Sequence, residues 1–150
     1  MLIQKAEWGD LIDVARLMCL LWPEHTLDEL LEECTEELLR GNTEYFLAKE
    51  KEEAIGFAAC SLRQDYVEGA ETSPVGYLEG IYVMEGQRGK GVARGLLKAA
   101  ETWAAERGCQ EFASDCELEN RESIAFHNAT GFRETNRIVC FTKRLRKEKE

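Results

Sequence analysis

The pattern of apolar and polar residues divides the chain into short segments of two kinds. Four segments place apolar residues at helical spacing, or stand between a capping residue and a glycine or proline, which predicts helices. Thr26 and Glu29, for example, form a capping box ahead of a leucine-rich stripe. The expected helices run from Asp10 to Pro23, from Thr26 to Gly41, from Leu96 to about Arg107, and from Asn120 to Gly131.

Shorter runs of β-branched, aromatic and aliphatic residues predict strands. They are Leu2 to Lys5, Glu44 to Lys49, Ala54 to Leu62, Tyr77 to Val83, Glu111 to Cys116 and Arg137 to Leu145. The second, third and fourth follow one another too closely for crossover connections, so they cannot all be parallel, whereas the later strand–helix–strand portion is expected to be parallel. The fold class is therefore α/β of the mixed α+β kind. We expect a central mixed β-sheet flanked by helices on both faces, in a single domain at residues 1–150 that ends in a charged, frayed tail.

The charge balance narrows the possible partners. Acidic residues exceed basic ones by 29 to 19, which gives a net charge of −10 and argues against nucleic acid. It suits a cationic small-molecule substrate, because a negative field concentrates cations, although acidity also simply keeps a protein soluble. No apolar run reaches the roughly 18 residues of a membrane helix, and the first residues lack the order of a signal peptide. We therefore expect a cytoplasmic protein without a membrane partner.

Cysteine and histidine usage argues against metal and covalent chemistry. The six cysteines, none in Cys-x-x-Cys spacing, are expected to be buried free thiols in a reducing compartment. The two histidines, His25 and His127, stand far apart, so we expect no metal site. Cys116 follows Asp115, but no histidine follows it in a dyad-like pattern, so nothing marks it as an acyl carrier.

A glycine-rich stretch from Gly86 to Gly95 lies between an expected strand and an expected helix. Backbone N–H groups at the start of a helix form a site for phosphate oxygens. The stretch is not a P-loop, because Gly91 rather than serine or threonine follows Lys90, and Arg94 stands where a dinucleotide fingerprint needs a small residue. The pattern that it does carry is Arg88-x-x-Gly91-x-Ala93.

Glu79 places a carboxylate inside an otherwise apolar strand. Simple alternation would put it on one face with Tyr77, Ile81 and Val83. Such a carboxylate either pairs with a nearby arginine or faces a substrate amine, which it would orient and deprotonate directly or through a water. Asp115, at the end of another strand, either caps a turn or shares the amine with Glu79.

The glycine-rich pattern, the order of elements and the run from Asn120 to Phe132 resemble the Gcn5-related N-acetyltransferases over nearly the whole chain. The resemblance implies acetyl-CoA as co-substrate, with its pantetheine arm beside the strand after Glu79 and its pyrophosphate at the glycine-rich stretch. Many members carry a tyrosine where this chain has His127, whose imidazole is a candidate for protonating the leaving thiolate; the alternative is a structural or exposed histidine. The implied cofactor-binding residues are Ile81, Tyr82, Val83, Arg88, Gly89, Lys90, Gly91, Val92, Ala93, Arg94 and Asn120.

Several further stretches resemble the bacterial aminoglycoside 6′-N-acetyltransferases. They are Leu21 to Pro23, Asp65 to Gly69, Ser73-Pro74, Leu78 to Ile81 and Ala113 to Asp115. This resemblance implies direct acetyl transfer to the 6′-amine in a ternary complex, with Glu79, Asp115 and His127 as candidate catalytic residues, and a homodimer by analogy. The implied substrate-binding residues are Trp22, Tyr66, Glu79, Asp115 and Asn136, the last in place of a usual acidic residue, with Glu134 close by.

Alternatives stay open for the role of Trp22 and for the acceptor. Trp22 also fits simple core packing at a helix end. The same chemistry could act on a polyamine, a peptide or another small amine. A chain of a different class would bind acyl-CoA or a drug without turnover.

Overall fold

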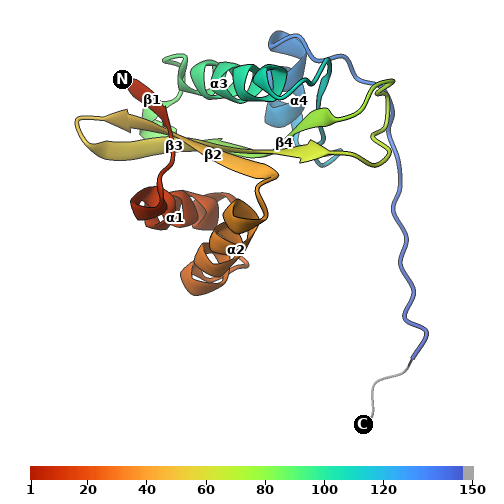
Figure 1. Cartoon of the computed structure of the whole chain (residues 1–150), viewed down its shortest axis with the longest axis horizontal. Helices are drawn as coiled ribbons and strands as arrows, with labels where there is room; N and C mark the ends of the chain where they lie inside the picture. The colour runs from red at the N-terminus through yellow and green to blue at the C-terminus, as the bar shows by residue number, and fades with distance from the viewer. Residues whose placement is uncertain (147–150) are drawn as a thin grey trace.

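A five-stranded β-sheet forms the middle layer of the structure, a computed structural model that describes residues 1–146 (Figure 1). Its strands lie in chain order. The pairs β1–β2, β2–β3 and β3–β4 are antiparallel, and the pair β4–β5 is parallel. They are β1 (Leu2–Lys5), β2 (Thr43–Glu50), β3 (Glu53–Arg63), β4 (Val75–Val83) and β5 (Phe112–Ser114). The predicted mixed sheet is confirmed, and residues 147–150 of the expected frayed tail lie outside the described part.

Helices cover both faces of this sheet, as predicted (Figure 1). α1 (Leu11–Leu21) and α2 (Leu27–Arg40) lie on one face, and α3 (Val92–Glu106) and α4 (Arg121–Ala129) lie on the other. Two single-turn helices, η1 (Trp8–Asp10) and η2 (Glu85–Gln87), precede α1 and α3. The predicted capping box forms, because Thr26 Oγ1 accepts the N–H of Glu29 at 3.2 Å. Within residues 1–146, no helix has both the length and the apolar character needed to cross a bilayer.

Three apolar clusters hold the layers together. The α3 cluster packs α3 on the sheet and includes Leu78, Ile81, Val83, Leu96 and Ala100. The α1–α2 cluster packs the other face and includes Val14, Met18, Leu30, Leu47 and Phe57. A small loop cluster of Val67, Val75 and Tyr77 fixes the polar loop between β3 and β4.

Glu79 is an extra residue in the pairing of β4 with β3. Gly80 pairs with Ala59 and Leu78 pairs with Cys60, so no β3 residue stands opposite Glu79. An inserted residue of this kind is a β-bulge, which breaks the alternation of side chains and turns one of them in a new direction.

The bulge changes which residues of β4 share a face of the sheet. Ile81 and Val83 pack in the α3 cluster together with Leu78, whereas Tyr77 packs in the loop cluster. The prediction that Tyr77, Ile81 and Val83 share one face is therefore wrong. The reason is the extra residue, which shifts the alternation by one position.

β4 and β5 separate soon after they meet. They pair only at Gly76–Leu78 against Phe112–Ser114. Within residues 1–146, the part of β4 from Glu79 to Val83 has β3 on one side and no strand on the other. This leaves a backbone edge that an extended ligand can pair with.

The last predicted strand, Arg137 to Leu145, is not a strand. Residues 133–146 form an extended segment that leaves the body of the molecule, with Phe141 91% exposed and Leu145 93% exposed (Figure 1). The alternating pattern is strand-like, but a strand needs a partner. The chain instead passes beside the loop before β4, where the Thr135 side chain lies against Gly69.

The cysteines are free but not uniformly buried, so that prediction is wrong in part. Cys34 and Cys60 are buried, whereas Cys116 and Cys140 are exposed. Cys116 follows β5, and Cys140 lies in the extended segment of residues 133–146, which leaves both thiols outside the packed layers.

Candidate functional site

The carboxylate of Glu79 pairs with an arginine, the first of the alternatives that the sequence leaves open. Nη2 of Arg63 donates to the two Glu79 oxygens at 2.8 and 3.0 Å, and Nε donates at 3.2 Å. The Ser61 hydroxyl donates to the same carboxylate at 2.5 Å. Glu79 is therefore a paired carboxylate whose side chain is 34% exposed, which leaves it accessible to a ligand.

Tyr77 links this ion pair to Asp115. The guanidinium carbon of Arg63 lies 3.5 Å from the centre of the Tyr77 ring, within cation–π range. The Tyr77 hydroxyl donates to the carboxylate of Asp115, which follows β5. Burial first, and then this hydrogen bond, raises the pKa of Tyr77, so the hydroxyl stays a donor. Glu79 and Asp115 thus lie in one network of side chains.

Sequence reasoning missed the residues that join the two carboxylates. Ser61 and Arg63 stand two positions apart at the end of β3, and so lie on one side of it, next to the bulge in β4. That spacing was visible in the sequence. Their contact with Glu79 depends on the β3–β4 register, which the sequence does not state.

A further carboxylate stands on the loop before β4. Glu68 accepts hydrogen bonds from the Tyr66 hydroxyl and from Nδ2 of Asn136, the latter at 2.8 Å. These two bonds, that from Tyr66 first, lower the pKa of Glu68. Tyr66 itself is 78% exposed, and Glu134 pairs with Arg137 instead of joining this group. Glu68 was not predicted as a site residue, yet it places a negative charge beside Asn136.

Trp22 lies against Gly80, the residue after Glu79. Its ring packs edge-on against Phe57, with 6.4 Å between centroids, and covers Gly80, where a Cβ would come within 2.6 Å of the indole. Trp22 is partly buried in the α1–α2 cluster. Trp22 thus packs on the core at the end of α1, and its indole lies against Gly80, the residue after Glu79.

The glycine-rich stretch ends in the start of α3, as predicted. Gly89 and Gly91 have φ of +80° and +83°, a left-handed conformation that glycine adopts without strain. Gly91 is the N-cap and supplies no side-chain cap, so the N–H groups of the first turn, from Val92 and Ala93 onward, lack a side-chain acceptor from the cap. The electropositive end of α3 is therefore available to an anion.

The three cations of this stretch point in different directions. Arg88 Nε donates to the Val83 carbonyl at 2.9 Å, and its guanidinium carbon lies 5.3 Å from the Tyr82 ring centre. Lys90 is exposed and donates to Gln87 at 3.3 Å. Arg94 turns toward α4 and donates to the Ala129 carbonyl at 3.2 Å. Arg88 precedes the two glycines and Lys90 stands between them, whereas Arg94 links α3 to α4.

His127 has a defined tautomer. Its Nδ1 lies 2.7 Å from the Ser123 carbonyl oxygen, which only accepts, so Nδ1 carries the proton. In the neutral ring, Nε2 is then an acceptor, and it lies 2.8 Å from the Ser114 hydroxyl, whose other acceptor is the Leu78 carbonyl at 3.3 Å. Asn120 caps α4, because its Oδ1 accepts the Ser123 N–H at 3.1 Å. Neutral His127 therefore has no proton on Nε2 to give, and only the imidazolium form can act as an acid there.

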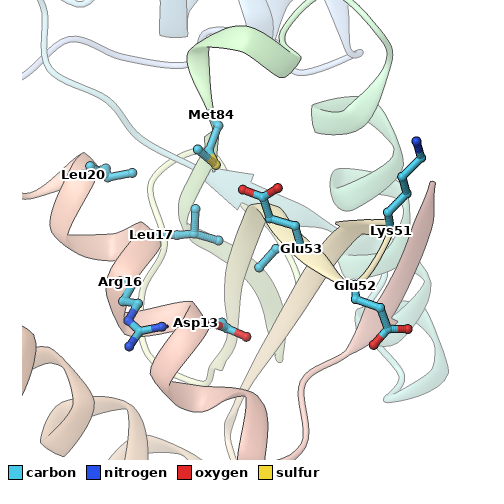
Figure 2. Close-up of a pocket in the computed structure, with 9 residues that line it drawn as sticks. Asp13, Arg16, Leu17, Leu20, Lys51, Glu52, Glu53 and Met84 are labelled. Carbon is cyan, nitrogen blue, oxygen red and sulfur yellow. Dashed lines mark ion pairs between the residues drawn. The ribbon is translucent and has the colours of Figure 1, made fainter.

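A separate hollow of about 530 Å³ lies between α1 and the β2–β3 turn, with Met84 between them (Figure 2). None of the predicted site residues lines it. Asp13, Glu52 and Glu53 make part of its wall, but nowhere in residues 1–146 does a group of three or more His, Cys, Asp or Glu side chains form a site for a metal ion.

Comparison with known proteins places this geometry in a family. The model of the Acetyltransferase (GNAT) family matches residues 8–132. The aminoglycoside N(6′)-acetyltransferase type 1 of Stenotrophomonas maltophilia is 44% identical over 140 residues, which cover 93% of this chain and 90% of that protein. The protein of the same name from Acinetobacter baumannii is 42% identical over 138 residues, with 91% and 94% covered. Among solved structures, AAC(6′)-Iy in complex with the bisubstrate analog CoA-S-monomethyl-acetylneamine matches at a TM-score of 0.91 and 40% identity, with 95% of this chain and 97% of that chain covered. The chain therefore belongs to the acetyltransferase (GNAT) family.

Proposed function

We propose that this chain transfers an acetyl group from acetyl-CoA to a primary amine, the 6′-amine of an aminoglycoside antibiotic. The observation that carries the proposal is the open edge of β4, with Glu79 at one end and the glycine-rich start of α3 beyond the other. A thioester on a long arm that ends in phosphates fits this line of backbone groups. The names of the relatives and the bisubstrate analog bound by AAC(6′)-Iy support the same acceptor.

On the donor side, the backbone of Ile81, Tyr82 and Val83 pairs with the pantetheine arm as an added strand. The N–H of Ile81 or Val83 polarises the thioester carbonyl. The pyrophosphate lies at the N-terminus of α3, with Gly89, Lys90, Gly91, Val92, Ala93 and Arg94 around it and Arg88 as a further cation. The oxygen of Asn120 caps α4, so its amide nitrogen is the group that contacts the cofactor.

On the acceptor side, Glu79, Asp115 and Glu68 supply carboxylates for the ammonium groups of a polycation. Tyr66 and the edge of Trp22 supply aromatic surface for sugar rings. Asn136 acts on the substrate through Glu68, which it holds by a hydrogen bond. Glu68, on the loop before β4, therefore supplies the negative charge that an acidic residue at position 136 would carry.

The reaction is a direct displacement on acetyl-CoA, which supplies an activated acetyl group. The neutral amine nitrogen attacks the thioester carbonyl carbon, the C–S bond breaks, and sulfur leaves with the electron pair as a thiolate. The nitrogen loses one proton to Glu79 or Asp115, directly or through a water. His127 as imidazolium donates a proton from Nε2 to the thiolate, since the neutral ring carries none there.

Free-thiol release from acetyl-CoA tests the proposal. Purified protein is incubated with kanamycin, and in parallel with spermidine and with peptides. Release with kanamycin is the expected result, whereas release only with spermidine or a peptide would show the same chemistry on another amine. Tight binding of acetyl-CoA in calorimetry, without any acetylated product by mass spectrometry, would show a non-catalytic binding protein.

We further propose that the chain is a homodimer in the cytoplasm, acting on a small molecule without nucleic acid or membrane partners. The net charge of −10 supports the choice of partners. Support for the dimer comes from the extended segment, in which Ile138 is 70%, Val139 is 77% and Phe141 is 91% exposed. A second copy would cover such apolar, strand-like surface. Light scattering after size exclusion tests this, and a monomer at micromolar concentration would contradict it.

A further inference from the structure

Arg63 fixes a positive charge at the carboxylate that the acceptor amine approaches. It contacts both oxygens of Glu79 at 2.8 to 3.2 Å and stacks on Tyr77 at 3.5 Å. Its side chain is 42% exposed, so the charge stands at the surface of the site. Because two different partners hold the guanidinium, we expect it to stay in place when the acceptor binds.

A fixed cation changes the chemistry of an amine beside it. An arginine stays charged at every pH at which the protein works. A like charge nearby disfavours the ammonium form of an amine and lowers its pKa. Attack on a thioester needs the neutral form, so Arg63 increases the reactive fraction of an amine that reaches Glu79 and weakens the binding of one that stays charged.

We propose that Arg63 keeps a larger fraction of the acceptor amine in the neutral form that attacks the thioester. Arg63 does this through its charge beside Glu79 and exchanges no proton itself. The inference rests on the proposed function and names the group that prepares the acceptor for attack.

The titratable groups near the Arg63–Glu79 pair are the same in the wild type and in every Arg63 variant, so they do not cause a difference between their pH profiles. The titratable groups that face the pair are Tyr77 on β4 and Asp115 after β5, whereas Cys60 on β3 lies in the α3 cluster on the other side of the strand. Burial raises the pKa of the Tyr77 hydroxyl and of the Cys60 thiol, so both stay protonated. The rising limb of kcat near neutral pH therefore reports the acceptor amine in the ternary complex.

The test compares wild-type protein with Arg63→Gln and Arg63→Lys, using kanamycin and spermidine as acceptors in the thiol-release assay. Arg63→Gln is expected to move the midpoint of the rising limb of kcat for kanamycin upward by about one pH unit, the scale of a nearby like charge. With spermidine, where it is turned over, the midpoint should move in the same direction, because the cation acts alike on any amine that reaches Glu79. Arg63→Lys keeps the charge and should keep the midpoint. Arg16→Gln is the matched control, because Arg16 also pairs with a carboxylate, that of Asp13 at 3.8 Å, at the separate hollow.

Two results would overturn the inference. A lower kcat with an unmoved pH midpoint would show that Arg63 only holds Glu79 in place. A lower KM for both acceptors, again with an unmoved midpoint, would show that the ammonium group displaces Arg63. If wild-type protein acetylates neither acceptor, the proposed function fails instead, so the two failures are distinguishable. Circular dichroism confirms that each variant is folded.

Discussion

Replacement of Gly80 by alanine would push a methyl group into the indole of Trp22. The new Cβ would lie 2.6 Å from one ring carbon and 3.0 Å from the next. Ordinary carbon–carbon contacts are about 3.5 to 4.0 Å, so the ring must move by about 1 Å. Because Trp22 also packs against Phe57, the strain spreads into the α1–α2 cluster.

Overpacking of this kind costs about 1 to 3 kcal/mol. In a domain of this size each kcal/mol lowers the melting temperature by about 2 to 4 °C, so we expect a loss of roughly 2 to 12 °C. Gly80 follows Glu79 directly, so a shift here can displace that carboxylate, and a 1 Å misplacement near a reacting group can cost about tenfold or more in rate. We therefore expect kcat/KM for kanamycin to fall about tenfold while KM for acetyl-CoA changes less than about twofold.

Thermal unfolding followed by circular dichroism and steady-state kinetics measure these two effects. The double variant Gly80→Ala with Trp22→Phe is the matched rescue, because the smaller phenylalanine ring does not reach as far as the indole edge that clashes. It should recover at least half of the lost melting temperature. An unchanged melting temperature in Gly80→Ala, or a double variant no more stable than the single one, would refute the contact between Trp22 and Gly80.

Three further predictions concern charge. Glu68→Gln should raise KM for kanamycin about two- to fivefold with little change in kcat, as expected for an exposed ion pair. Adding Asn136→Asp should restore KM, because it places the carboxylate on the other side of the same hydrogen bond. A double variant that binds kanamycin as weakly as the single one would count against this role of Glu68. His127→Gln should lower kcat with little change in KM for acetyl-CoA, because only the imidazolium can donate from Nε2, and an unchanged kcat would leave His127 a purely structural residue. The Glu7 N–H first, and Lys49 after it, lower the pKa of Asp10 against the opposing effect of partial burial. The stabilising effect of Asp10 is therefore present above about pH 4 and is lost as the pH falls through the lowered pKa. The melting temperature of Asp10→Asn should lie below that of the wild type at pH 7 and equal it near pH 2. A difference in melting temperature that persists in acid would contradict the assignment.

The sequence predicted the elements that depend on local signals. The capping box at Thr26, the glycines of the loop and the strand periods act within a few residues, so their consequences can be read locally. The helices and the first five strands accordingly fall within a few residues of their predicted bounds. The glycines Gly89 and Gly91 adopt the left-handed backbone that the start of α3 requires.

The features that were missed depend on register or on partners. The bulge at Glu79 arises from the pairing of β4 with β3, and the contacts of Arg63 follow from that pairing. Glu68 meets Asn136 across 68 residues of sequence, so no local pattern connects them. The segment from Arg137 to Leu145 has the local pattern of a strand but no neighbouring strand among residues 1–146.

The bulge in β4 lets the strand carry a charged group without replacing an apolar side chain of the core. Because Glu79 is additional to the paired residues, Leu78, Ile81 and Val83 keep their places in the α3 cluster on both sides of it. The charged group thus occupies no position that the core needs. Substitutions of Glu79 can therefore change the reaction while leaving the packing of the sheet on α3 intact, which makes this residue a point where activity can be altered independently of folding.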